Sequence, residues 1–109
     1  MANTFKSFGN AGAGTSAATV YTAPSATTST VIGLTLSNVA TGGVSADIEL
    51  VKSGGSSFYI AKAAPVPLGG TFVVVGGEQK LVLEAGDRID VTSDTASSID
   101  TIISVLEIT

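Results

Sequence analysis

Alternation of apolar and polar residues over positions 44–52 restricts the fold of this chain more than any other feature of its sequence. The alternating residues are, in order, Val44, Ser45, Ala46, Asp47, Ile48, Glu49 and Leu50. A period of two places the apolar residues on one face of a β-strand and the polar residues on the other. No long segment of the chain has the apolar spacing of an amphipathic helix. We therefore predict an all-β fold.

Further short segments rich in Val, Ile, Thr, Tyr and Phe have the character of strands. With the first segment included, the predicted strands cover residues 4–8, 18–23, 29–38, 44–52, 57–64, 71–75, 80–83, 88–92 and 99–108. Turn residues separate them at intervals of about 8–12 positions, which is typical of sandwiches and barrels. The length of 109 residues suits one domain. We predict a single-domain antiparallel β-sandwich over residues 15–109, jelly-roll-like, with roughly eight to nine strands.

Residues 1–14 are predicted to form an N-terminal arm that ends in a glycine-rich hinge at positions 9–14. The arm carries Phe5 and Phe8. A short apolar segment on a flexible tether can add a strand to a neighbouring molecule, or it can be an edge strand of its own chain. Both interpretations stay open. We predict four interaction residues: these two phenylalanines, and Val51 and Val82 as exposed apolar positions.

Composition argues against most classes of chemistry and of partner. Only 13% of residues are charged, the net charge is −4, and neither cysteine nor histidine occurs. Without a basic stripe we expect no nucleic-acid binding, and without an apolar run of about 20 residues we expect no membrane-spanning helix. The N-terminus lacks the apolar core of a secretory signal. We predict no catalytic residues, no enzymatic activity, no cofactor and no metal.

The segment LVLEAGDRIDV at residues 81–91 concentrates acidic residues in a predicted hairpin. Its apolar residues would face the core on both sides of the turn, which leaves Glu84, Asp87 and Asp90 on the solvated side. Asp87 would bond the backbone amides that follow it. The alternative is a hard-cation site with oxygen ligands from residues Asp87, Asp90, Asp94 and Asp100, although their spacing matches no EF-hand loop. Whether this region binds a cation stays open.

Association with further copies is a natural supplement to the stability of this chain. Many residues are Gly, Ala, Ser or Thr, large core residues are few, and no disulfide can form. Residues 99–108 are apolar on both faces, as expected for a strand between two packed layers or at a subunit interface. We therefore predict a homo-oligomer, with a trimer as the expected form. Tyr21 and Tyr59 are candidate sugar platforms, although packing is the favoured interpretation for both.

The segments VYTAPSATTSTVIGLTLSN, LEAGDRIDV and the closing SVLEIT carry a resemblance that covers nearly the whole chain. The sequence resembles small β-sandwich structural proteins of tailed bacteriophages, notably marine and cyanobacterial phages. The resemblance implies a non-enzymatic virion protein, with capsid decoration as the first expectation. Such a protein binds the outer capsid surface and bridges capsid subunits, so the major capsid protein or other virion proteins would be its partners.

Two alternatives are kept beside capsid decoration. One is a tail, fibre or receptor-binding component of the virion, and the other is a carbohydrate-binding module. The resembling segments are structural rather than catalytic, so the resemblance transfers no functional residue to this chain.

Overall fold

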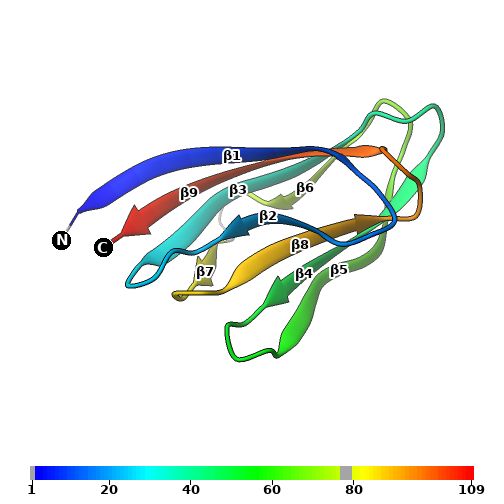
Figure 1. Ribbon diagram of the computed structural model, residues 1–109. Helices are drawn as coiled ribbons and strands as arrows, with labels where there is room; N and C mark the ends of the chain where they lie inside the picture. The colour runs from blue at the N-terminus through cyan, green and yellow to red at the C-terminus, as the bar shows by residue number, and fades with distance from the viewer. Residues whose placement is uncertain (1, 77–79) are drawn as a thin grey trace.

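The computed structural model describes residues 2–76 and 80–109 and folds them into two antiparallel β-sheets that face each other (Figure 1). The strands are β1 (Asn3–Ala13), β2 (Ala18–Thr22), β3 (Thr28–Asn38), β4 (Val44–Val51), β5 (Ser57–Val66), β6 (Thr71–Val75), β7 (Leu81–Leu83), β8 (Arg88–Ser93) and β9 (Ile99–Ile108). The described residues contain no helix, and hence none that could cross a membrane. The predicted all-β sandwich is confirmed.

Strand order identifies the type of sandwich. Sheet A runs β1-β9-β3-β6, with β7 also paired to β3, and sheet B runs β2-β8-β4-β5. Strand β6 pairs with residues 34–37 of β3 and β7 with residues 29–31, so the two act as halves of one edge strand. Counted in that way, eight strands are divided equally between the two sheets, in the strand order of a jelly roll. The jelly-roll-like prediction is therefore confirmed.

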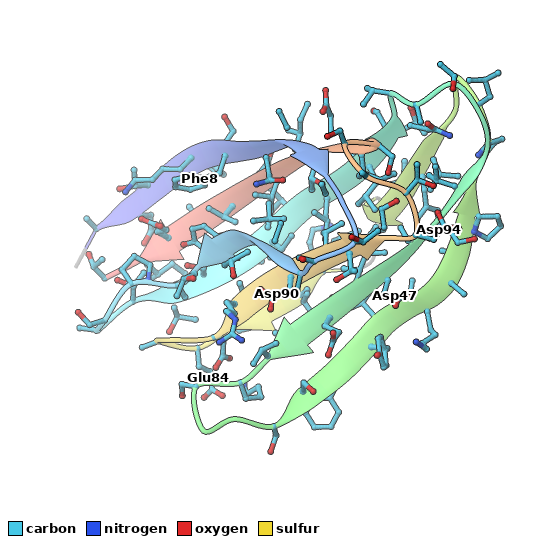
Figure 2. The ribbon with its side chains drawn as sticks, turned by 45° about the vertical axis from the view of Figure 1, so that its right-hand side comes forward. Phe8, Asp47, Glu84, Asp90 and Asp94 are labelled. Carbon is cyan, nitrogen blue, oxygen red and sulfur yellow. The ribbon has the colours of Figure 1, made fainter. Side chains whose placement is uncertain are left out.

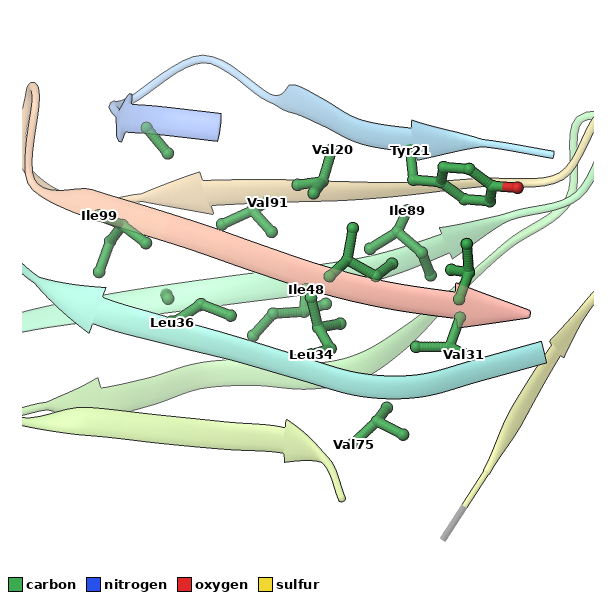
Figure 3. Close-up of a cluster of buried hydrophobic side chains, with 14 of the residues drawn as sticks. Val20, Tyr21, Val31, Leu34, Leu36, Ile48, Val75, Ile89, Val91 and Ile99 are labelled. Atoms are coloured by element: carbon green, nitrogen blue, oxygen red, sulfur yellow. The ribbon is translucent and has the colours of Figure 1, made fainter. Parts of the chain in front are cut away.

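The core lies between the two sheets and consists of aliphatic side chains of moderate size (Figure 3). The largest fully buried side chains are Leu34, Leu36, Ile48, Leu83, Ile89, Ile99, Ile103, Val31, Val66, Val75, Val91 and Val105. They come from strands of both sheets because every second residue of a strand faces inward. Burial of apolar surface stabilises a fold by about 25 cal/mol per Å², so this layer supplies the main stabilising contribution.

Strand β1 differs from the predicted arm and hinge. Residues 3–13 pair with β9 inside the same chain, from Asn3 opposite Ile108 to Ala13 opposite Ile99. Residues 9–13 of the glycine-rich part belong to this strand and contain an irregularity between Asn10 and Ala13. Gly12 has a φ of 67°, a conformation that glycine adopts without strain and that β-bulges often require. Of the two interpretations left open for the arm, the structure shows the edge strand of its own chain.

Candidate functional site

Strand pairing assigns the residues of sheet A to an inner and an outer face. Directly opposite residues of antiparallel strands point to the same side of the sheet. One outward row consists of Phe5, Leu106, Thr30 and Val82. A second outward row consists of Gly9, Ile102, Thr35 and Val73. Between these rows stand Ser7, Ser104 and Gly33. We call the surface formed by these three rows the outer face of sheet A.

This outer face exposes large apolar side chains. The exposed fractions are 73% for Phe5, 54% for Val82, 59% for Ile102 and 60% for Val73. Among the described residues that pairing places on this side of sheet A, the charged residue is Asp100, at the start of β9. Exposed apolar patches on soluble proteins mark interaction sites. The outer face of sheet A is therefore the candidate site for binding another protein.

The corresponding face of sheet B is charged. Asp90 and Glu49 lie opposite each other in one row, and Asp47 follows on β4 (Figure 2). Asp90 accepts a hydrogen bond from Thr19 Oγ1 at 2.8 Å, and Asp47 accepts one from the backbone N–H of Ala63 at 2.7 Å. These carboxylates hold neighbouring strands together. The two outward faces of the sandwich therefore differ in character.

Three of the four predicted interaction residues are exposed. Phe5 and Val82 lie in one row of the outer face of sheet A, whereas Phe8 is on the other side of β1, with its ring centroid 5.0 Å from that of Tyr21. Val51 is only 9% exposed, so its prediction as an exposed position is wrong. Its direct cross-strand neighbours, Arg88 and Ser57, flank it on both sides.

Asp87 is buried in the structure, although the hairpin pattern predicts a solvated position. Its side chain accepts hydrogen bonds from Lys52 Nζ at 2.6 Å and from the backbone N–H groups of Glu84 at 2.9 Å and Ser53 at 3.0 Å. Burial acts to raise the pKa of Asp87, but these three bonds outweigh it and hold the pKa below its usual value. The carboxylate thus joins the turn before β8 to the end of β4. Glu84 is exposed, as predicted.

The other acidic residues of the proposed cation site also have partners. Asp90 lies on the outer side of sheet B, as predicted, but it is only 7% exposed, so the solvent contact expected of it is wrong. Asp94 accepts a hydrogen bond from the backbone N–H of Ser45 at 3.1 Å, and Asp100 accepts one from Gly12 at 2.9 Å. Within residues 2–76 and 80–109, no group of three or more potential ligands is placed to hold a metal ion.

A polar cluster that the sequence analysis missed joins the two sheets near β1. The Tyr21 hydroxyl donates to Glu107 Oε2 at 2.5 Å and lies 2.6 Å from Ser29 Oγ, and Lys6 Nζ lies 2.8 Å from Glu107 Oε1. Burial, followed by the bond to Glu107, raises the pKa of Tyr21 to about 12. The bonds from Lys6 and Tyr21 lower the pKa of Glu107. The sequence did contain a sign of this cluster. Ile103 and Val105 face inward, and Glu107 continues their two-residue spacing, so it faces inward as well.

An open cavity of about 440 Å³ lies over this cluster, between the edge strands of the two sheets. Its lining includes Phe8, Val20 and Pro24 besides the polar residues. Tyr21 is 5% exposed and cannot offer its ring to a sugar, so packing, the favoured interpretation for this residue, is confirmed. Tyr59 is 52% exposed, with Lys62 Nζ at 4.6 Å from its ring centroid.

Comparison with known proteins gives a likeness of fold. No family model matches the sequence, and no curated protein matches it. A solved structure of Bacillus endospore appendages, described as a novel family of disulfide-linked pili, superposes with a TM-score of 0.57. The alignment covers 99% of this chain and 87% of that chain at 15% identity. Since this chain has no cysteine, the likeness extends to the β fold and not to the disulfides.

Proposed function

We propose that this chain is a non-enzymatic structural protein of a bacteriophage virion, and that it decorates the capsid by binding the outer capsid surface. The observation that carries the proposal is the outer face of sheet A, which presents apolar side chains and almost no charge. A decoration protein needs such a surface because burial of apolar area is the main contribution to stable association. The charged face of sheet B would remain in solvent.

The size of the outer face suits a protein partner. Strands β9 and β3, with ten and eleven residues, lie at the centre of sheet A, so the whole outer side of this sheet is roughly 33 Å long at about 3.3 Å per residue. Four strands about 4.8 Å apart add a width of about 19 Å, so the projected area is about 600 Å². Stable interfaces bury about 800 Å² of accessible surface per partner. Accessible area exceeds projected area because side chains make the surface uneven. The outer side of sheet A is therefore close in size to the area that one partner of a stable interface buries.

The rest of the described chain supports a structural role. The carboxylates considered as cation ligands serve to hold strands or turns together, as Asp87, Asp90 and Asp94 do. The major capsid protein is the proposed partner. A tail or fibre component is the alternative within the same class. A sugar-binding module is less well supported, because one of its two candidate tyrosines is buried.

The number of copies of this chain in each particle tests where in the virion it is located. Quantitative mass spectrometry of purified particles is expected to give one chain for each major capsid protein, or a fixed simple ratio to it. A few to a few tens of copies would instead assign the chain to the tail or fibre. Absence of the chain from particles would overturn the virion proposal.

A pair of variants tests the docking face. Ile102→Lys places a charge on the outer face of sheet A. The control Phe58→Lys places a charge on β5, in the other sheet. The two native side chains are matched in exposure, at 59% for Ile102 and 60% for Phe58. We expect the first variant to bind particles that lack the protein at least about tenfold more weakly, because the charge would be desolvated on docking. The second variant should bind as the unmodified chain does. Equal binding by both would remove the outer face from the proposal.

A further inference from the structure

Four strand edges in this sandwich offer unpaired backbone groups, and three of them have features that discourage pairing with another chain. Such features include short strands, proline, bulges and charged side chains. Strand β2 has five residues and a register shift, and β6 and β7 have five and three residues. Strand β5 contains Pro65, two register shifts and Ala63 at a φ of 51°.

Strand β1 lacks these protections over most of its length. It has eleven residues and no proline, and its register with β9 is regular from Asn3 to Asn10. Every residue from Asn3 to Gly9 is exposed. Its single charged side chain, Lys6, is paired with the buried Glu107 on the inner side of the sheet. The edge is thus long, regular and uncovered (Figure 1).

The hydrogen bonds at the chain ends show which backbone groups of β1 are free. The Ala2 N–H donates to the Thr109 carbonyl, and the Thr109 N–H donates to the Ala2 carbonyl, at 3.3 and 3.0 Å. Residues that exchange both bonds alternate along an antiparallel pair. The regular register therefore turns the N–H and C=O groups of the odd-numbered residues away from β9. These residues are Asn3, Phe5, Ser7 and Gly9.

We propose that the free edge of β1 pairs antiparallel with β1 of a second copy, with the two-fold axis at Ser7. This register places Phe5 opposite Gly9 of the second copy, and an aromatic residue across from glycine is a favourable cross-strand pair. Lys6 then faces Phe8 of the second copy, where its ammonium meets an aromatic ring. A register centred on Lys6 would oppose two like charges, which destabilises strand pairing.

The pairing would join two A sheets into one continuous sheet and set their outer faces side by side. It does not depend on attachment to a virion, since it is a property of the free chain. An isologous contact of this kind closes at two copies, in contrast to the trimer expected from the sequence. A mass measurement therefore separates the two assemblies.

Proline at position 7 tests the proposal without disturbing the fold. The Ser7 N–H points away from β9, so Ser7→Pro removes a donor from the free edge and none from the sheet. Sedimentation equilibrium of the full chain up to about 100 µM should show a reversible dimer for the unmodified chain and for the control Ser7→Thr. Ser7→Pro should stay monomeric with its circular dichroism unchanged. A monomer or trimer of the unmodified chain, or a dimer of Ser7→Pro, would overturn the proposal.

A cysteine at the same position gives a readout that does not need proline to be tolerated. The chain contains no cysteine, so Ser7→Cys introduces a single thiol. In the proposed register the two Cα atoms are about 5.5 Å apart, within the range that a disulfide spans. Mild oxidation of the folded protein should give a covalent dimer at least about tenfold faster than for the control Ser57→Cys, on the edge strand β5. Equal rates would contradict the pairing.

Discussion

Substitution of Asp87 by asparagine provides a quantitative test of how the turn before β8 is held to the end of β4. The side chain is fully buried and receives hydrogen bonds from Lys52 Nζ and from the backbone N–H groups of Ser53 and Glu84. All three partners are donors. Asparagine keeps the size of the side chain but replaces one acceptor oxygen by an NH₂ group, which would then face a donor.

Two losses add up in this variant. The bond from Lys52 changes from a charged pair to a weaker neutral acceptor, at a cost of about 1–2 kcal/mol, and one buried donor loses its partner, at a cost of about 1–3 kcal/mol. We therefore expect the free energy of unfolding to fall by roughly 3 kcal/mol. This loss is a large fraction of the free energy of unfolding of a typical domain, which is about 5–15 kcal/mol.

The control is Glu84→Gln, which removes another carboxylate that contacts the same lysine. Glu84 Oε1 lies 2.9 Å from Lys52 Nζ, but its side chain is 76% exposed. Exposed ion pairs contribute about 0–1 kcal/mol, so this variant should lose little. Urea denaturation followed by circular dichroism, with the slope m unchanged, gives both values. Equal losses in the two variants would refute the reasoning that burial of Asp87 makes it important.

Further predictions concern pH and the core. In a Tyr59→Phe background the remaining tyrosine, Tyr21, should ionise near 12 in absorbance titrations. The unfolded chain loses this proton near pH 10, so the free energy of unfolding should fall as the pH rises from 10 to 12. A titration midpoint at pH 10 in the folded protein would refute this. The lowered pKa of Glu107 contributes stability that is present above 4.5 and is lost as the pH falls through the folded value. Glu107→Gln should therefore flatten the acid limb of the stability curve measured by urea denaturation. Ile103→Ala should cost about 2–5 kcal/mol and its exposed neighbour Ile102→Ala less than about 0.5 kcal/mol by the same measurement; similar losses would contradict the assigned faces.

The architecture could be predicted from the sequence because it depends on local alternation. Residues Val44, Ala46 and Ile48 are buried as their period of two requires. Burial of every second residue is set within each strand, and the turn residues between strands are visible in the sequence. The same reasoning gave the correct exposure for Val82, whose neighbours on β7 face the core.

The errors arise where long-range pairing decides the outcome. Asp87 is buried because Lys52 and Ser53, more than thirty positions away, donate to it, and no local pattern reports such a partner. Val51 is covered for a related reason, since Arg88 and Ser57 flank it from two other strands. The glycines after Phe8 suggested a hinge, yet pairing with β9 orders them as a strand.

The candidate site was predicted in part. Phe5 and Val82 were recognised as exposed apolar residues, but nothing in the sequence showed that one row across four strands contains both. That relation follows from the strand order β1-β9-β3-β7, which is a property of the whole fold. Ile102 and Val73 were missed because each lies in a segment whose apolar residues occupy both faces.

Hydroxyl-radical footprinting of the intact particle tests the central claim most directly, because it reads the exposure of individual side chains in the assembled state. If the outer face of sheet A binds the capsid, Phe5, Val73 and Ile102 should be labelled in the free chain and protected in the particle. Tyr59, at the edge of sheet B, should be labelled equally in both. Protection of Tyr59 together with unchanged labelling of those three residues would contradict the account.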